Sequence, residues 1–271
     1  MSQISQDLIK RREKNIPQGP FNTTTAFIKK AEGACMTDVD GKKYIDFAGG
    51  IGVNNVGHSH PKVVKAITDQ AKSYIHTCFH VAMYEPYVEL AEKLNMLAPG
   101  NFDKMTMFAN SGAEAVENAV KITRYATKRT GIICFENAFH GRTQMAMSLT
   151  SKVKPYKLNF GPFVPEVYRM PYAYCYRCPF KLKYPSCDTA CADFLEDFFI
   201  GNVAPENTAA VIAEPIQGEG GFVTPPAEYF PKLKKICEKY DIPLIIDEIQ
   251  AGSGRTGKFF AIEHWGIEPD V

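Results

Sequence analysis

Four segments of the sequence place chemically capable side chains directly after an apolar run. In the first, the run KMTMFAN leads into Ser111-Gly112-Ala113, which opens a segment with helical spacing. The free backbone N–H groups at a helix N-terminus attract anions, and the Ser111 hydroxyl adds a hydrogen-bond donor. The turn therefore fits a phosphate site, although it also fits a tight turn in which Ser111 only caps the helix.

The second segment is Phe139-His140-Gly141-Arg142-Thr143, again after an apolar run. Its aromatic ring can lie over a flat heterocycle or pack in the core, and both interpretations stay open. Arg142 carries a planar guanidinium that grips a carboxylate through two hydrogen bonds. Because the helix dipole does not favour a cation in the first turn of a helix, an anionic partner explains Arg142 better than a surface position does.

The third segment contains two acids, since an apolar run ends at Glu214 and the glycine-rich loop that follows carries Glu219. Such loops allow the backbone to approach a ligand closely. A flexible connection with two solvated acids is an equally good interpretation of this segment alone.

In the fourth segment, the apolar run Pro243–Ile246 leads straight into Asp247. An acid at the end of a buried strand is poorly hydrated unless it is paired. A protonated pyridine nitrogen would pair with it and would stay cationic, so that the ring accepts electrons from a substrate carbanion. A helix N-cap or a metal ligand is the alternative, but no histidine cluster supports a metal, and we predict none at this site.

The elements that carry these segments alternate from Lys104 onward between strand-like and helix-like patterns. Continuous apolar strands separated by helices predict an α/β fold with a mostly parallel sheet and helices on both faces. Ligands bind such sheets at the carboxyl ends of the strands. The strands are expected at 105–109, 132–135, 210–214 and 243–247, and an irregular stretch at about 153–192.

The part of the chain before Lys104 reads differently. Residues 1–15 are polar and helical, and Asp40-Gly41 lies between two short alternating segments, which is typical of a β-hairpin. Pro61 suits the first turn of a helix, and a second helix is expected from Glu85 to about Leu97.

The bulk composition excludes several classes of partner. The 271 residues include 31 basic and 30 acidic side chains, giving a net charge of +1, so nothing in the charge favours nucleic acid or a membrane surface. No apolar run approaches the roughly 20 residues needed to span a bilayer, and the N-terminus lacks the apolar core of a secretory signal. We expect a cytoplasmic protein.

The order and spacing of the four segments, with GRTGKFFAIEHWGIEPDV after them, resemble the class III aminotransferases, which are fold-type-I pyridoxal-phosphate enzymes. The resemblance runs from about Asn15 to Val271. The stretches HTCFHVAMYEPYVELAEKLN, EAVENAVKITRYATKR and AEPIQGEGGF are more similar to 4-aminobutyrate aminotransferases than to acetylornithine or ornithine relatives. The resemblance implies that residues 1–60 belong to the small domain and residues 61–271 to the large, cofactor-binding domain.

The resemblance also implies a role for each matching residue at a pyridoxal 5'-phosphate site. The roles are the phosphate-binding turn, the aromatic ring stacked on the cofactor with a histidine beside it, the pocket acid, the catalytic partner of the pyridine nitrogen, the apolar residue on the opposite ring face, and the donor to the ring hydroxyl. The phosphate-binding turn matches Ser111, Gly112 and Ala113, and the stacked aromatic ring with its histidine matches Phe139 and His140. The pocket acid is Glu214, and the catalytic partner of the pyridine nitrogen is Asp247. Ile249 matches the residue on the opposite ring face, and Gln250 matches the donor to the ring hydroxyl.

Three further matches concern the substrate. Arg142 matches the residue that holds the far carboxylate of a 4-aminobutyrate-like substrate, Ile51 an apolar wall, and Glu219 the acid that pairs with a switching arginine from the C-terminal part. The implied activity transfers the amino group of an ω-amino acid, expected to be 4-aminobutyrate, to 2-oxoglutarate, in a homodimer or a dimer of dimers. An acetylornithine- or ornithine-type aminotransferase and a same-fold aminomutase are the alternatives.

The sequence departs from the family pattern at its end. The family's catalytic lysine follows a Pro-Asp-Val motif, here Pro269-Asp270-Val271, by a few residues, and Lys258 lies in a loop that varies among relatives. We therefore expect these 271 residues to be the N-terminal two-thirds of the enzyme and to be inactive alone. A third alternative follows, namely an inactive fragment or incomplete reading frame that acts at most as a cofactor-binding module.

A second departure is a cluster of four of the eight cysteines. The spacing C-x₂-C followed by C-x₃-C can bind zinc or an iron–sulfur cluster. A surface insertion whose thiols stay reduced in the cytoplasm is the alternative, which we favour at this point. The cluster comprises Cys175, Cys178, Cys187 and Cys191.

Overall fold

The computed structural model describes residues 1–271 and divides into two compact units, Met1–Tyr84 and Glu85–Val271. The division falls later in the chain than the boundary predicted at residue 60. The assignment of residues 1–60 to a small domain stays a prediction.

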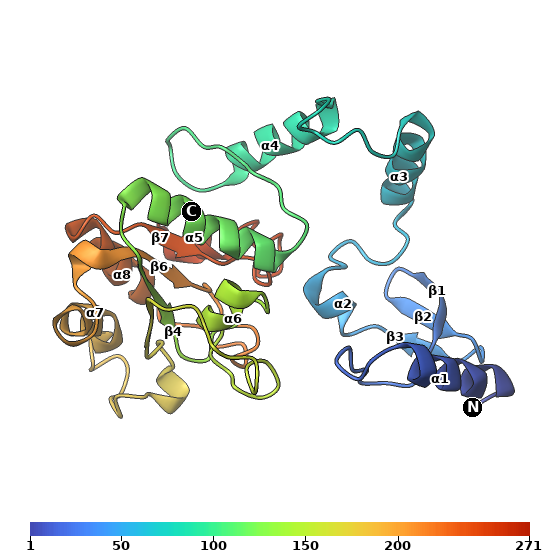
Figure 1. The fold of residues 1–271 in the computed structure, drawn as a ribbon, viewed down its shortest axis with the longest axis horizontal. Coiled ribbons are helices and arrows are strands. Elements are labelled where there is room, and N and C mark those ends of the chain that lie inside the picture. The colour runs from blue at the N-terminus through green and yellow to red at the C-terminus, as the bar shows by residue number, and fades with distance from the viewer. The chain divides into compact units, whose positions relative to one another are not determined.

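The first unit is built around a small antiparallel sheet of three strands in the order β1-β2-β3 (Figure 1). The predicted hairpin is confirmed, because Gly41 adopts a φ of +83° between β2 and β3, and the Asp38 carboxylate accepts hydrogen bonds from the backbone N–H groups of Asp40 and Lys42. The elements of this unit are α1 (Gln3–Asn15), β1 (Ile28–Glu32), β2 (Cys35–Asp38), β3 (Lys43–Ile45), α2 (Gly49–Gly52) and α3 (Pro61–Ser73).

The second unit contains the strand–helix alternation that the sequence predicts. Its longer elements are α4 (Glu85–Leu97), α5 (Gly112–Thr127), β4 (Gly131–Phe135), α6 (Gln144–Leu149), β5 (Val167–Met170), α7 (Ala190–Gly201), β6 (Thr208–Ala213), α8 (Tyr229–Lys239) and β7 (Leu244–Ile246). Three short 3₁₀ turns are η1 (Cys175–Arg177), η2 (Pro205–Asn207) and η3 (Ala261–Trp265).

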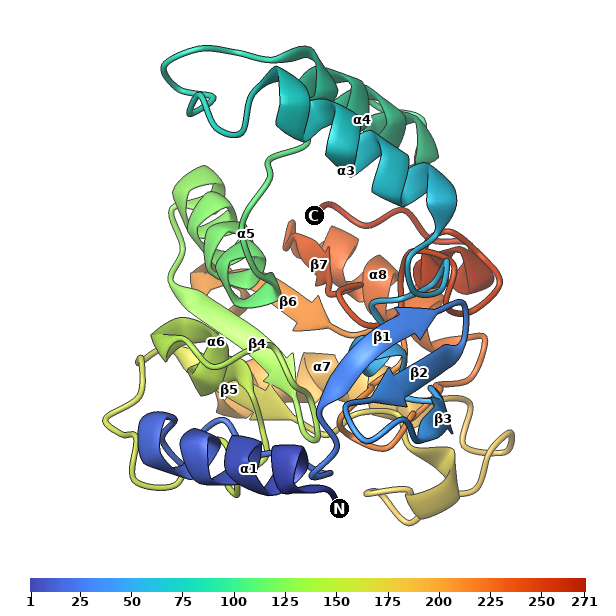
Figure 2. The same ribbon diagram turned by 90° about the vertical axis from the view of Figure 1, so that its right-hand side faces the viewer.

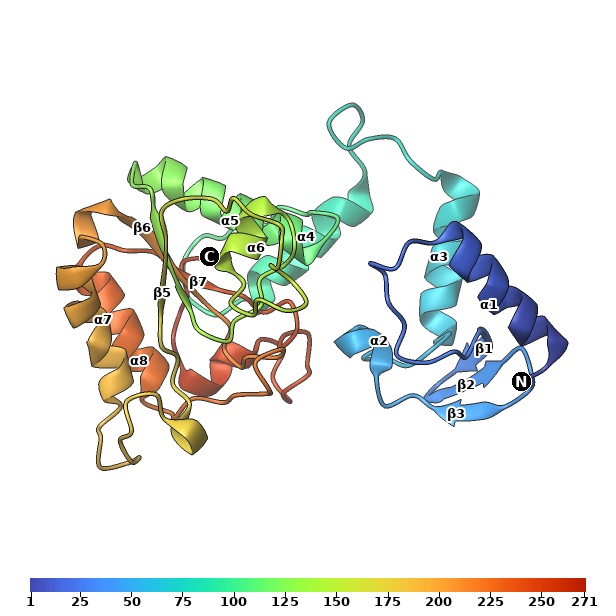
Figure 3. The ribbon, with the colours of Figure 1, turned by 60° about the horizontal axis from the view of Figure 1, so that its bottom comes forward.

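The four strands form one parallel sheet in the order β5-β4-β6-β7, which confirms the predicted fold class (Figure 2). Strands β4, β6 and β7 are buried at every residue, so both faces of the sheet must be covered. Ile132 and Cys134 of β4 pack with α5 and α6, whereas Ile133 and Phe135 point the opposite way toward α7 and α8. The two helix layers are visible on either side of the sheet in Figure 3.

The strand predicted at 105–109 is absent, and that prediction is wrong. The segment is not paired to any strand, Met105 is fully exposed, and the Thr106 hydroxyl bonds to the Asn95 side chain instead of to a neighbouring backbone. Alternating apolar residues give a segment the capacity to form a strand, but a strand also needs a partner with free backbone groups. On the edge strand β7, the Ile246 N–H donates to Val271 O, so this backbone group is not free to pair with a further strand.

The stretch predicted to be irregular, 153–192, is wrong in part. It contains β5, which pairs along its whole length with β4, and the first residues of α7. Strand β5 escaped prediction because VYRM is short and three of its four residues are only half buried. No helix combines the length and the apolar character that crossing a bilayer requires.

Candidate active site

The site lies at the carboxyl ends of three parallel strands. Ala213 of β6 is in register with Ile246 of β7, and Ile133 of β4 with Val211 of β6, so these strands end at one edge of the sheet. The predicted acids Glu214 and Asp247 are the next residues after two of those ends. Parallel sheets bind ligands at this edge, as the sequence predicts.

The centre of the site is a hydrogen bond between two buried side chains. His140 Nδ1 lies 2.7 Å from Asp247 Oδ2, and the two residues are only 2% and 7% exposed. The second carboxylate oxygen, Oδ1, accepts the Ile249 backbone N–H at 3.1 Å. An ionised carboxylate only accepts hydrogen bonds, so the imidazole must carry its proton on Nδ1. The bond fixes both the position of the carboxylate and the tautomer of the histidine.

Glu214 lies beside this pair and has the opposite character. Its Oε1 accepts the Phe139 backbone N–H at 3.3 Å, while its Oε2 is buried without a hydrogen-bond partner. Burial, and secondarily the charge of Asp247, raise the pKa of Glu214 to about 8. At neutral pH the site therefore combines a protonated acid with a histidine-supported carboxylate, and two such carboxyls can take different roles.

The predicted phosphate turn begins α5. Ser111 is the helix N-cap, and its hydroxyl oxygen accepts the Glu114 N–H at 3.2 Å. A Cβ on Gly112 would come within 2.9 Å of two side-chain carbons of Ile249, so glycine is required for the turn to meet the segment after Asp247. The turn at Ser111 is thus close to Ile249, which lies 138 positions later in the chain.

The histidine segment approaches the same turn from the other side. Gly141 adopts a φ of +124°, and a Cβ there would lie 2.8 Å from the Cβ of Ala113. Only glycine combines that backbone conformation with so close a contact. The turn thus contacts the histidine segment at Ala113 and Gly141, and it contacts the aspartate segment at Ile249. The three segments meet around one centre.

The glycine-rich loop closes against Gln250. A Cβ on Gly218 would lie 1.6 Å from the Gln250 amide oxygen, which is far inside van der Waals contact. Gln217 is buried, its amide donates to Glu136 O at 2.8 Å, and its Oε1 has no partner. Three buried polar atoms in this region thus lack a protein partner: His140 Nε2, Glu214 Oε2 and Gln217 Oε1.

Phe139 lies at the rim, where an aromatic residue that the sequence did not single out joins it. The rings of Phe139 and Tyr156 are 4.8 Å apart, and the Tyr156 hydroxyl donates to Glu219 Oε2 at 2.7 Å. Arg142 is exposed and close enough to lower the pKa of Tyr156, which burial and Glu219 together raise. Tyr156 was missed because nothing in a Tyr- and Pro-rich stretch distinguishes one tyrosine from another.

Ile51 belongs to the first unit and is described within it alone. Its side chain is 74% exposed, and its backbone adopts a left-handed φ of 58°. A β-branched residue rarely takes that conformation, which is a sign of a functional constraint. Its role as a pocket wall stays a prediction.

Comparison with known proteins matches this arrangement to one family. The sequence model of class-III aminotransferases matches residues 18–271. The chain is 51% identical to a probable 4-aminobutyrate aminotransferase of Bacillus subtilis over 96% of this chain and 60% of that protein. It is 46% identical to the 4-aminobutyrate aminotransferase of Escherichia coli over 98% of this chain and 61% of that protein. It is also 46% identical to a 5-aminovalerate aminotransferase of Pseudomonas putida, over 100% and 62%.

Solved structures agree. An ω-transaminase of Thermomicrobium roseum superimposes with a TM-score of 0.89 at 32% identity, covering 98% of this chain and 61% of that one. An amine transaminase from an uncultivated Pseudomonas species, solved with bound pyridoxal phosphate, gives 0.83 at 30% identity, covering 93% and 58%. The chain belongs to the class-III aminotransferase family, and it spans about 60% of the length of the curated relatives it matches.

The cofactor of this family is pyridoxal 5'-phosphate, and the residues present fit it. A fixed, buried carboxylate, Asp247, suits a cationic ring nitrogen, and the helix N-terminus at Ser111 suits a phosphate. The glycines at 112, 141 and 218 allow the segments that carry Ile249, Ala113 and Gln250 to pack closely around this centre, because a Cβ at each glycine would meet one of those side chains. When bound, the cofactor supplies an electron sink for the carbanion of the substrate.

Proposed function

We propose that the full-length enzyme, meaning a chain as long as its curated relatives, transfers the amino group of 4-aminobutyrate to 2-oxoglutarate with pyridoxal phosphate. The observation that carries the proposal is the buried His140–Asp247 hydrogen bond beside the protonated Glu214, at the carboxyl ends of the strands, where parallel sheets bind ligands. The 51% identity to a probable 4-aminobutyrate aminotransferase supports the choice of amino donor.

Asp247 holds the proton on the pyridine nitrogen in this proposal. Its carboxylate oxygens accept hydrogen bonds from His140 and from the Ile249 N–H, which hold the group in position. Glu214, neutral at pH 7, adds no second negative charge beside it and can donate a hydrogen bond through its buried oxygen. Asp247 thereby carries the negative charge opposite the ring nitrogen, and Glu214 donates a hydrogen bond.

The remaining cofactor contacts follow the geometry of the loops. The N–H groups at Ser111, Gly112 and Ala113 bind the phosphate, Phe139 and Ile249 enclose the ring from its two faces, and Gln250 donates to the ring hydroxyl. The close packing of these segments around Gly112 and Gly218 supports this arrangement. Ile51 forms part of the substrate wall.

Arg142 determines the preference for an ω-amino acid. It follows the cofactor-stacking segment directly, it is exposed, and it lies within electrostatic reach of the Tyr156–Glu219 pair. A guanidinium at that place binds the carboxylate at the far end of the substrate and leaves the amino group at the cofactor. When the second substrate binds, the Glu219 carboxylate can release the Tyr156 hydroxyl and pair instead with the switching arginine expected in the C-terminal part of the enzyme.

A second candidate amino donor is 5-aminovalerate, because a 5-aminovalerate aminotransferase is 46% identical to the chain over its whole length. It carries the same two end groups with one more methylene, a difference that typically contributes about 1–3 kcal/mol to discrimination. Measured values of kcat/KM for 4-aminobutyrate, 5-aminovalerate, ornithine and N-acetylornithine, each with 2-oxoglutarate, decide among these donors. A preference for N-acetylornithine, or isomerisation without an oxo acid, would sink the proposal.

We also propose that the full-length enzyme works in the cytoplasm as a homodimer or a dimer of dimers. The eight cysteines are free thiols, as expected in a reducing compartment. Light scattering on the full-length enzyme would test the oligomeric state.

A further inference from the structure

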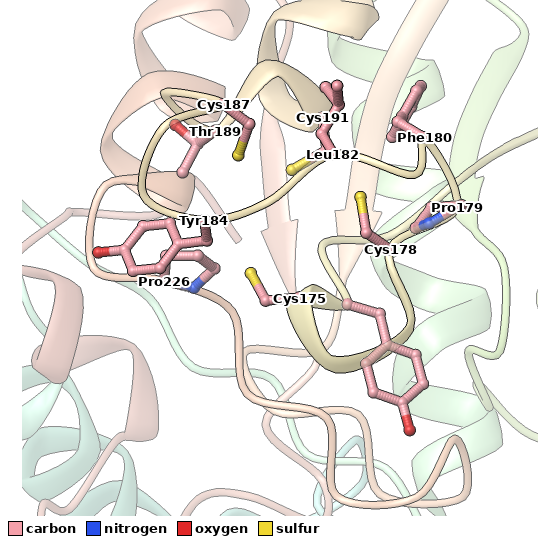
Figure 4. A pocket seen from close by; sticks show the side chains of 11 residues that line it. Cys175, Cys178, Pro179, Phe180, Leu182, Tyr184, Cys187, Thr189, Cys191 and Pro226 are labelled. Atoms are coloured by element: carbon pink, nitrogen blue, oxygen red, sulfur yellow. The ribbon is translucent and has the colours of Figure 1, made fainter.

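Four cysteines that the proposed reaction does not use line one small cavity, which is formed mainly by the segment that joins β5 to α7. Cys175, Cys178, Cys187 and Cys191 all line it, together with mainly apolar and aromatic side chains such as Tyr184 and Pro226. The cavity measures about 10 Å³, which is room for roughly one water-sized body. Figure 4 shows the four sulfur atoms facing the same space.

The cysteines come from two short turns that meet there. Cys175 opens the 3₁₀ turn η1, in which the Arg177 N–H donates to Tyr174 O, and Cys178 follows it directly. Cys187 precedes the N-terminus of α7, and Cys191 is the second residue of that helix. Two ligands from each of two tight turns is the arrangement that C-x₂-C and C-x₃-C spacings produce in structural zinc sites.

The segment that carries the two turns contains little regular secondary structure. From Pro171 to Thr189 the only regular element is η1, while Tyr176 is 82% exposed and Leu182 and Tyr184 are nearly half exposed. Tyr172 and Ala173 are buried at its start, but most of the stretch lacks regular structure, so a cross-link would stabilise one conformation of it. All four thiols are free, so no disulfide supplies it.

The cavity suits one ion better than a cluster or a disulfide. The thiols converge but do not yet form a cage, because no group of three or more potential ligands stands ready to hold a metal. A single tetrahedral ion suits a space of this size once the four side chains turn inward, whereas an iron–sulfur cluster would need far more than about 10 Å³. The cations Arg177, Lys181 and Lys183 lie within the same segment and offset the negative charge of a tetrathiolate centre.

We propose that Cys175, Cys178, Cys187 and Cys191 bind one zinc ion as a structural site. Binding is free of redox change: four thiols lose four protons, and one Zn²⁺ joins four thiolates to give a centre of charge −2. Zinc with four protein ligands has no open position, so the ion stabilises the fold and takes no part in amino transfer. Tyr172, three residues before Cys175, donates through its hydroxyl to Glu214 O at 2.8 Å, so a fixed segment also steadies the strand end that carries Glu214.

The test uses the full-length enzyme, purified under reducing conditions from zinc-supplemented cells and passed over a desalting column. Elemental analysis should find about one zinc per chain in the wild type and in Cys35→Ser, whose thiol lies in the first unit. The Cys175→Ser/Cys191→Ser double variant should fall to background. Background zinc in the wild type, or stoichiometric zinc retained in the double variant, would overturn the proposal.

A second measurement does not depend on the folding of a variant. X-ray absorption at the zinc edge of the wild type should give four sulfur neighbours at about 2.3 Å. Nitrogen or oxygen neighbours in place of sulfur, or iron with acid-labile sulfide in place of zinc, would refute the zinc tetrathiolate. Removal of zinc by a chelator should lower the melting temperature, and added zinc should restore it.

Discussion

His140 Nδ1 and Asp247 Oδ2 are joined by a 2.7 Å hydrogen bond between two side chains that are almost completely buried and 107 residues apart in the chain. The bond holds the carboxylate from the segment that follows β4, so the partner proposed for the cofactor's ring nitrogen does not depend on its own loop alone for orientation. The imidazole has its second nitrogen buried without a partner. The pair therefore behaves as one unit, and its disruption can be measured from either side.

Replacing His140 by Ala in the full-length enzyme should lower kcat and weaken cofactor binding together. Loss of one donor to a buried carboxylate costs about 1–3 kcal/mol, which corresponds to roughly 5- to 150-fold. The measurements are steady-state kinetics and the Kd of pyridoxal phosphate for the cofactor-free enzyme. His264→Ala serves as the control, because His264 is exposed and bonds only to Thr256. Wild-type values in His140→Ala would remove the histidine from the proposed mechanism.

Glu214 should make the cofactor-free enzyme less stable as pH rises. Its folded pKa of about 8 lies above the ordinary value of 4.5, so between those pH values the folded state keeps a proton that the unfolded state has lost. The unfolded state then binds fewer protons, and the free energy of unfolding falls with pH across that window by up to a few kcal/mol, on the order of the linkage for a shift of this kind.

Glu214→Gln should flatten that pH dependence in denaturant unfolding measured at pH 5.5 and pH 8. The matched control is Glu206→Gln, because Glu206 is an exposed acid of the same unit. If Glu214→Gln and the wild type lose stability in parallel over this range, the buried carboxyl is ionised and the assignment of a neutral Glu214 fails.

Gly218→Ala should displace Gln250, since the new methyl would occupy the place of its amide oxygen. Overpacking typically costs about 1–3 kcal/mol, and here we expect it mainly as weaker cofactor binding, because the amide can swing away. Gly201→Ala is the control, since a Cβ at the end of α7 meets nothing within 4 Å. Equal cofactor affinity in the two variants would show that Gln250 does not contact the cofactor.

Arg142→Ala should raise the KM for 4-aminobutyrate. A charge-assisted hydrogen bond contributes about 1.5–3 kcal/mol, so kcat/KM should fall by roughly 10- to 150-fold. Butylamine, which lacks the far carboxylate, provides the internal control and should lose nothing. An equal loss for both amines would mean that Arg142 supports the fold and does not read the carboxylate.

The architecture was largely predictable because it depends on local patterns. The buried runs at β4, β6 and β7 and the helical spacing of α4, α5 and α8 each carry a strong signal, and parallel strands bring their carboxyl ends together by geometry alone. The segment at 105–109 shows the limit, since its alternation is clear but pairing depends on a neighbouring backbone that local pattern does not reveal. The prediction missed strand β5 for the opposite reason, since four residues, three of them half buried, are too few to give a pattern.

The site was predictable as a set of residues but not as a set of contacts. Glu214 and Asp247 follow their strands visibly in the sequence, whereas the His140–Asp247 bond and the Tyr156–Glu219 bond join residues 107 and 63 positions apart. Such contacts depend on side-chain packing in three dimensions, which single-sequence periodicity does not contain. The positive φ of Gly141 is likewise a property of the folded loop.

The order β5-β4-β6-β7 has a kinetic consequence for the chain. Every pairing in the sheet is parallel and requires a long crossover, and such non-local contacts form slowly because loop closure must precede them. The histidine and the aspartate lie in the segments that follow β4 and β7, and these two strands are joined only through β6 between them. Their hydrogen bond can therefore close only after these three strands have assembled, so a chain competent to hold the cofactor is one in which β4, β6 and β7 have already paired.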